Sequence, residues 1–156
     1  MGKLTKWLRM MGFDSLFFNG SDDSDMVRQA LTENRVILTR DTEIILRKVV
    51  KKGQIKAILI SSEFPEIQMI QVIETLNLAD SLQPFTRCLE CNALLVEQVK
   101  ERIKNRVPPY VFSTQEQYME CPACHRIYWR GTHWEAMIKR LQSLTGNKTN
   151  TLEEVS

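Results

Sequence analysis

The sequence predicts an α/β fold, with a parallel sheet flanked by helices, followed by a smaller unit built around cysteines. Two observations carry this prediction. Short apolar segments alternate with helical ones over roughly the first eighty residues, which is the pattern of a parallel sheet. All four cysteines of the chain then lie in two Cys-x-x-Cys pairs, Cys88 with Cys91 and Cys121 with Cys124.

The first segments of the chain alternate between helix and strand. Residues 3–11 carry apolar side chains at helical spacing, and Gly12 is a typical stop for such a helix. Residues 13–18 (FDSLFF) are predicted to form a short strand. A polar turn then leads to a second helix over residues 24–33.

The following segments complete the alternation. Residues 35–39 (RVILT) and 55–60 (IKAILI) are nearly continuous apolar runs, which is typical of strands buried in a parallel sheet. Residues 42–52 between them are predicted to be one helix that ends at Gly53. A further helix is predicted over residues 65–78, because proline favours the first position of a helix.

The alternation stops near residue 84, which predicts three parts. An α/β domain covers residues 1–83, a ribbon covers residues 84–144, and a disordered tail covers residues 145–156, where the chain is polar and has no periodicity. Within the ribbon, the two prolines at residues 108–109 predict a rigid extended connection.

Length and composition are those of a globular protein. The chain has 156 residues, of which 43% are hydrophobic and 26% charged. No apolar run approaches the roughly 20 residues of a membrane-spanning helix, and no signal peptide opens the sequence. We therefore expect a cytoplasmic protein that does not bind a membrane. The net charge of +2 is too small to predict nucleic-acid binding by itself.

The cysteine spacing indicates a structural metal site. Each Cys-x-x-Cys turn brings two thiolates close enough to bind one ion, and two turns complete a tetrahedral shell. The alternatives are two disulfides, which need an oxidising compartment, or four unconnected buried thiols. We predict a closed Zn²⁺ site formed by Cys88, Cys91, Cys121 and Cys124, which leaves no open position for catalysis. His125 is either a surrogate ligand or a turn residue.

Carboxylates follow two of the predicted strands. Asp41 comes just after the apolar strand at residues 35–39. The acidic cluster Asp22, Asp23 and Asp25 lies at the start of the helix that follows the first predicted strand. The carboxyl ends of parallel strands meet at one edge of a sheet, where functional groups collect. Carboxylates that converge there suit Mg²⁺ or Mn²⁺, which take oxygen ligands. The alternative is that these residues only cap helices, where negative charge is favourable.

Basic and aromatic residues are interleaved in the second half. Arg102, Lys104 and Arg106 alternate along the chain, which would place them on one face of an extended segment. Trp129 and Arg130 belong to a further basic and aromatic run. Positive charge beside aromatic platforms suits single-stranded nucleic acid. The alternative is that the aromatic rings fill a small core and the charges face solvent.

Five segments resemble the mut-seven C-terminal RNase domain family. They are GKLTKWLRMMGFD (2–14), RVILTRD (35–41), RCLECNALL (87–95), RVPPYVF (106–112) and CPACHRIYWRGTHWEAM (121–137). The cysteine motif with its YWRGTHWE trailer is the most specific of them. The resemblance implies a PIN-like RNase fold with a zinc ribbon at its C-terminal end, and hence a metal-dependent ribonuclease that hydrolyses phosphodiester bonds.

The resemblance also implies roles for individual residues. By position, Asp41 matches one acidic metal ligand, and Asp25, with Asp23 beside it, matches another. These residues would be catalytic, with Mg²⁺ or Mn²⁺ as the second metal besides the structural zinc. RNA is the implied partner, preferably single-stranded. We expect Arg40 to contact it together with the basic and aromatic residues of the ribbon.

The sequence departs from the family pattern at its start. Members of this family usually begin with a short apolar strand that ends in an aspartate, just before the first helix. No such strand precedes Lys3 in this sequence. We therefore expect a vacant sheet position beside residues 36–39. The alternative function is a catalytically inactive zinc-ribbon module that binds RNA or protein.

Overall fold

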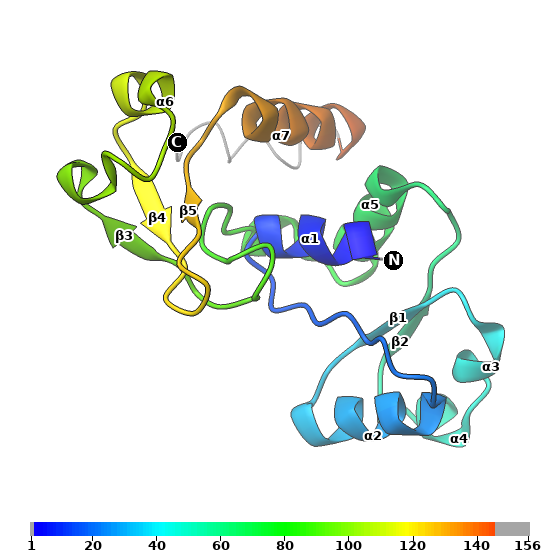
Figure 1. The fold of residues 1–156 in the computed structure, drawn as a ribbon. Helices are drawn as coiled ribbons and strands as arrows, with labels where there is room; N and C mark the ends of the chain where they lie inside the picture. Colours follow the sequence, from blue (N-terminus) through cyan, green and yellow to red (C-terminus); the bar gives the residue numbers. More distant parts are fainter. Residues whose placement is uncertain (1, 146–156) are drawn as a thin grey trace.

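The computed structural model of this protein describes residues 2–145 (Figure 1). In chain order the elements are α1 (Gly2–Met10), α2 (Asp23–Glu33), β1 (Ile37–Thr39), α3 (Thr42–Ile45), α4 (Lys48–Lys51), β2 (Ala57–Leu59), α5 (Pro65–Thr75), the 3-10 helix η1 (Ala79–Ser81), β3 (Val96–Gln98), the 3-10 helix η2 (Lys100–Ile103), α6 (Pro109–Thr114), β4 (Tyr118–Glu120), β5 (Ile127–Tyr128) and α7 (Thr132–Thr145). The predicted tail, residues 145–156, lies outside the described residues except for Thr145. No helix in the described part is long and apolar enough to cross a membrane.

A parallel pair of strands, β1 and β2, confirms the predicted α/β class. Ile37 pairs with Ala57 and the register continues for three residues, with α3 and α4 in the connection between the strands. The N–H of Ile37 and the carbonyl of Thr39 bond to the β2 segment, so the polar groups of Leu38 point to the opposite edge. Among the described residues no strand pairs with that edge, which is the position expected to be vacant.

Both faces of this strand pair are covered. Leu38 and Ile58 are neighbours in the register and face a core that includes α1 and α5. Ile37 and Ala57, the next pair, face a second cluster with α2 and α3. That cluster consists of Val27, Ala30, Ile37, Ile44 and Ile55. Burial on both faces is the reason that these strands are apolar without alternation.

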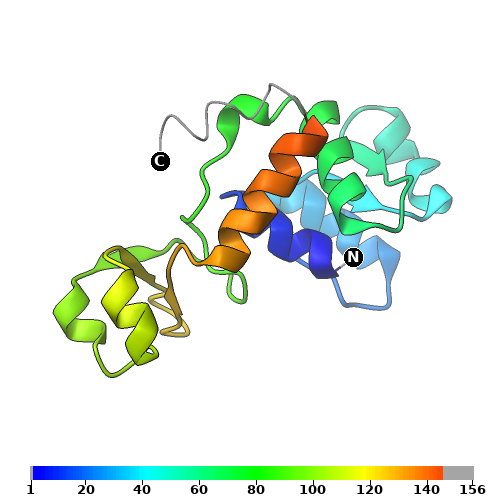
Figure 2. The same cartoon turned by 90° about the horizontal axis from the view of Figure 1, so that it is seen from above.

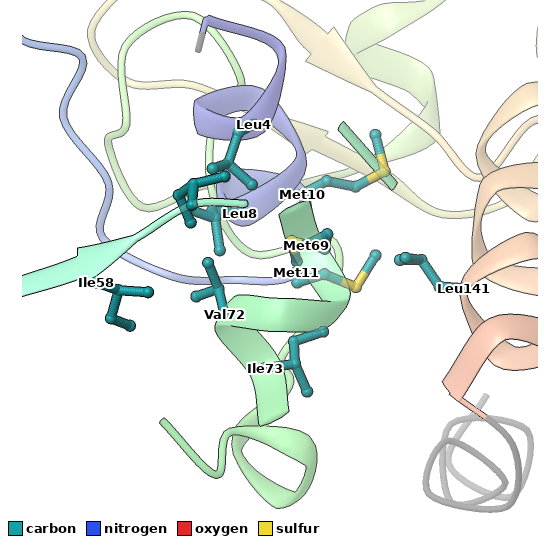
Figure 3. Packing of buried hydrophobic residues seen from close by; sticks show 10 residues of the cluster. Leu4, Leu8, Met10, Met11, Ile58, Met69, Val72, Ile73 and Leu141 are labelled. Carbon is teal, nitrogen blue, oxygen red and sulfur yellow. The ribbon is translucent and has the colours of Figure 1, made fainter. Parts of the chain in front are cut away.

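The main core lies where α1, α5 and α7 meet (Figure 3). It consists of Leu4, Leu8, Met10, Met11, Ile58, Ile60, Met69, Val72, Ile73 and Leu141. Leu4 and Leu8 are one turn apart on α1, as are Met69 and Val72 on α5, so each helix presents an apolar stripe. Figure 2 shows α7 beside α1 and α5, and Leu141 brings α7 into this core.

The end of α1 confirms the predicted stop at Gly12. This residue has φ 94, a conformation that glycine adopts without strain. The N–H of Phe13 donates to the carbonyl of Leu8 at 3.0 Å, which satisfies one of the last carbonyls of the helix. A Cβ on Gly12 would clash with the carbonyl oxygen of Gln83. The N–H of Gln83 in turn donates to the carbonyl of Met11 at 2.8 Å. The end of α1 is therefore held against the chain that leads to the ribbon.

Two predictions for the first half are wrong. Residues 13–18 do not form a strand, because no neighbouring strand pairs with them in the described structure, and Phe17 is 52% exposed. Residues 42–52 form the two short helices α3 and α4 instead of one. Arg47 separates the two helices, because its ψ of 144 is extended and not helical. Its guanidinium donates to Ser24 Oγ of α2 at 3.3 Å.

The second half contains a three-stranded antiparallel sheet in the order β3-β4-β5. The small core beside it consists of Ile103, Val107, Val111 and Tyr118. The prediction of a rigid extended connection at residues 108–109 is wrong, because Pro109 begins α6, where a fixed φ and a missing N–H suit the first turn. The division of the chain at residue 84 stays a prediction, since α7 follows this sheet in sequence but packs on the main core.

The main core predicts a contrast between two neighbouring positions of α5. Met69 is fully buried and Ile67 is 43% exposed. We expect Met69→Ala to lower the free energy of unfolding by about 2–5 kcal/mol, since it removes packed atoms and leaves a cavity. Ile67→Ala is the matched control and should change it by less than about 1 kcal/mol. Urea unfolding followed by far-UV circular dichroism measures both, and equal losses would contradict this packing.

Candidate metal centre and the groove beside it

The four cysteines converge on one point. Their Sγ atoms all lie within 4.8 Å of one another, and the Cys88 and Cys124 sulfurs are 3.7 Å apart. A tetrahedral zinc ion with Zn–S bonds of about 2.3 Å requires sulfurs about 3.8 Å apart. All four thiols are free, so they form no disulfides in this structure. The donor set and its spacing therefore fit a closed Zn²⁺ site.

Two matching turns, the first knuckle (residues 88–92) and the second knuckle (residues 121–125), build this site. In each, the N–H of the second cysteine lies 3.4 Å from the sulfur of the first. The residue after the second cysteine, Asn92 or His125, has φ 65 and closes the turn through its N–H to the first cysteine's carbonyl. The N–H groups of Cys91 and Cys124 thus point at sulfur, where they stabilise thiolates.

The electrostatics of the site favour a cation. The pKa of Cys124 is lowered to about 6, first by the backbone N–H of Arg126 and also by its neighbouring thiols. The pKa of Cys91 is raised to about 12, first by its hydrogen bond with Cys124 and then by burial. The Tyr128 hydroxyl, 3.1 Å from the Cys88 sulfur, has a raised pKa because it is buried beside that sulfur. A metal ion replaces the protons that such crowded thiols otherwise retain.

His125 is a turn residue of the second knuckle. Among the described residues the group of possible metal ligands at this site contains the four cysteines and no histidine. His125 Nδ1 lies 3.1 Å from Glu120 Oε2, and Arg106 donates to the other oxygen of Glu120 and to the carbonyl of His125. The hydrogen bond from Arg106, followed by that of His125, lowers the pKa of Glu120.

A groove of about 1230 Å³ lies along the free edge of β1. Its walls come from α1, the segment 13–20, α2 and β1, and Val72 of α5 also lines it. Asp23 and Arg40 line it as well, and so does Glu90, which stands between Cys88 and Cys91 in the chain. The groove thus connects the metal centre, through the first knuckle, with the carboxyl end of β1.

The acidic residues that we expected to bind Mg²⁺ or Mn²⁺ lie near the starts of α2 and α3. Asp41 Oδ1 accepts from the N–H of Glu43 at 2.9 Å and caps α3. Asp23 is half-buried at the groove, and Asp25 is exposed and paired with Arg28 at 2.9 Å. Within the described residues the cysteines form the one group of three or more candidate ligands close enough to share an ion. The structure does not bring the three acids into such a group.

The basic and aromatic residues expected to bind RNA are not aligned. Arg102 belongs to η2 and Lys104 follows it, so together with Arg106 they do not share the face of an extended strand as predicted. Trp129 packs on the small core of the ribbon. The Arg130 guanidinium lies over the rings of Phe85 and Trp134, at 5.4 and 5.1 Å from their centres. Arg40, Arg102, Lys104 and Arg106 are exposed.

Sequence reasoning missed a polar network between the first knuckle and the α/β part. Arg35 donates to both oxygens of Asp14, at 3.0 and 3.2 Å, and Asn92 Nδ2 donates to Asp14 at 2.6 Å. The hydrogen bond from Arg35 is the largest cause of the lowered pKa of Asp14, against the opposing effect of burial. Each residue lies in one of the segments that resemble the family, 2–14, 35–41 and 87–95, but no spacing rule indicated that the three would meet.

The comparison with protein families bears on the whole chain. The model of the family described as Mut7-C RNAse domain matches residues 1–141. This chain belongs to the Mut7-C RNAse domain family. Searches of curated proteins and of solved structures gave no match. The Mut7-C chain therefore combines a small parallel sheet, its helices and a cluster of four cysteines.

The metal centre of the Mut7-C chain predicts a clear difference between two substitutions. We expect the wild type to bind about one zinc ion per chain, and Cys88→Ser to bind none. The ribbon of this variant should unfold, since binding of structural zinc contributes about 10–16 kcal/mol to folding. His125→Gly keeps the positive φ and should retain the ion. Elemental analysis of the purified variants measures this. Full zinc content in Cys88→Ser, or none in His125→Gly, would contradict the ligand set.

The Asp14–Arg35 pair predicts a pH-dependent stability. The lowered pKa of Asp14 means that the charged pair stabilises the fold above the unfolded pKa, near 3.8, and that this contribution is lost as pH falls through the folded pKa. We expect Asp14→Asn to cost about 1 kcal/mol at pH 7, because the pair is half-exposed, and almost nothing near pH 2. Urea unfolding at both pH values tests it. Asp25→Asn, in an exposed pair, is the control, and a cost for Asp14→Asn that does not change with pH would contradict this role.

Proposed function

We propose that this protein is a metal-dependent ribonuclease that hydrolyses phosphodiester bonds of RNA at an acidic Mg²⁺ or Mn²⁺ site. The observation that carries the proposal is the match to an RNAse domain family over residues 1–141. The zinc ion would stabilise the fold of the ribbon, and the ribbon would assist RNA binding. We further propose that the α/β part is PIN-like and that the protein acts in the cytoplasm.

The proposed catalytic site lies at the carboxyl end of β1. Asp41 uses Oδ1 to cap α3, which leaves Oδ2 for a cation. Asp23 lines the groove that runs along β1, and Asp25 is two residues further along α2. We assign these three carboxylates the role of holding and orienting a divalent ion. When bound, that ion supplies positive charge that stabilises the phosphoryl oxygens during hydrolysis.

Exposed cations support the proposed RNA partner. Arg40 is exposed, lines the groove and directly precedes Asp41, so it is placed to meet a phosphate beside the acids. Arg102 and Lys104 are exposed on the ribbon. We propose a preference for single-stranded RNA, whose phosphates remain accessible to separate cations along an open groove.

A second candidate is a catalytically inactive module that binds RNA or protein through its ribbon. Two observations favour it. In the described structure Asp41, Asp23 and Asp25 do not form a group close enough to share an ion. Within residues 2–145, no strand occupies the sheet position beside β1, so none contributes a further carboxylate there.

Cleavage of labelled single-stranded RNA with added Mn²⁺ tests the proposal. Asp41→Asn removes the charge but keeps a residue that caps helices well. We expect it to lower cleavage by about 100-fold, a loss typical of disturbed metal sites. Asp22→Asn is the matched control, because Asp22 caps α2 in the same way and is not one of the assigned ligands.

The outcomes separate the two candidates. Cleavage that is lost in Asp41→Asn and kept in Asp22→Asn supports the ribonuclease with Asp41 as a ligand. Equal cleavage by the wild type and Asp41→Asn would contradict the assigned site. Retention of RNA on a filter without cleavage by the wild type would favour the binding module.

A further inference from the structure

The first knuckle contributes both to the cysteine cluster and to the lining of the groove. Cys88 and Cys91 supply two of the four sulfurs, and Glu90 between them lines the groove beside β1. Lys6 of α1 pairs with Glu90 at 2.8 Å. Arg9 of the same helix donates to the carbonyls of Leu89 and Glu90, at 2.7 and 3.3 Å. The knuckle is therefore attached to α1 through Leu89 and Glu90.

Asn92 connects this knuckle to the segment 13–20, which forms a wall of the groove. Its Nδ2 donates to Asp14 Oδ1 at 2.6 Å, and its Oδ1 accepts from the N–H of Ser15 at 3.1 Å. Arg87 adds a parallel connection, with donors to the carbonyls of Asn92 and Gly12 at 2.9 and 3.1 Å. Both Asp14 and Ser15 line the groove.

Besides these bonds, the wall is held by the pair of Arg35 with both oxygens of Asp14, at 3.0 and 3.2 Å. The segment 13–20 has no regular secondary structure, and its apolar residues Leu16 and Phe17 are both more than 40% exposed. Besides Asn92, the anchor of Ser15 is a bond from Arg9 Nε to its carbonyl at 2.8 Å. A segment held by a few polar bonds opens with a low free-energy cost, so losing one of them is measurable.

We propose that metal occupancy of the cysteine tetrad sets the shape of the groove through Asn92. The side chain reaches Asp14 and Ser15 only while the residue keeps φ 65 at the close of the knuckle. That strained conformation persists when the surrounding turn enforces it. The turn is closed by the Asn92 N–H to the Cys88 carbonyl, and a metal bound by Cys88 and Cys91 would fix both ends of it. Zinc bound in the ribbon thus orders the segment 13–20 in the α/β part. This coupling goes beyond the proposed function and does not depend on RNA cleavage.

The second knuckle offers an internal comparison. His125 occupies the equivalent position and has the same φ, but its side chain contacts Glu120 within the ribbon. The backbone geometry of the two knuckles is alike, so the connection to the groove resides in the asparagine side chain. Asn92→Gly and His125→Gly therefore form a matched pair, since glycine keeps the positive φ and removes only the side chain.

Amide hydrogen exchange of the zinc-loaded full chain tests the proposal. We expect Asn92→Gly to retain its zinc and to exchange the Ser15 amide roughly tenfold faster than the wild type, the effect of losing one hydrogen bond. His125→Gly should leave Ser15 unchanged. Removing zinc from the wild type with a chelator should accelerate exchange of the Ser15 amide by at least the same factor. The same treatment of Asn92→Gly should cause little further acceleration.

Three results would overturn the coupling. The first is wild-type exchange at Ser15 in zinc-loaded Asn92→Gly. The second is chelation that leaves Ser15 protected in the wild type. The third is simultaneous loss of protection at Val72 and Ile73 of the main core, which would mean that the whole protein unfolds and that no local coupling exists.

Discussion

Four thiols that lie within 4.8 Å of one another connect the two turns on which the ribbon depends. They join two turns that are far apart in the chain, and the second turn lies between β4 and β5 of the antiparallel sheet. The first knuckle also carries the bonds from Arg9 and Arg87 that set the ribbon against α1. A small sheet with a modest apolar core depends on such a centre, because a short segment alone buries too little surface to fold.

α1 links the parts of the protein. One side of it contributes Leu4 and Leu8 to the main core with α5 and α7, and its polar residues Lys6 and Arg9 hold the first knuckle. Its end, at Gly12, contacts the chain that leads to the ribbon. The hydrophobic contacts supply most of the stabilisation, and the hydrogen bonds determine orientation, since a net hydrogen bond contributes only about 1 kcal/mol.

The groove beside β1 extends from the proposed catalytic site to the first knuckle of the cysteine cluster. Asp23 and Arg40 line it on the α/β part, and Glu90 lines it from the first knuckle. The candidate acids also have local roles, because Asp41 caps α3 and Asp25 pairs with Arg28. Capping and metal binding draw on the same carboxylates, which is the reason that spacing alone left both interpretations of these residues open.

The sequence by itself determined the parts whose information is local. Cysteine spacing predicted the metal centre, apolar runs predicted two parallel strands, and Gly12 predicted the end of α1. Tertiary structure alone decided that residues 13–18 are not a strand, because a strand exists only with a partner to accept its hydrogen bonds. It also decided the Asp14–Arg35–Asn92 network and the packing of α7 on α5, since these contacts join residues whose proximity arises only after the chain has folded.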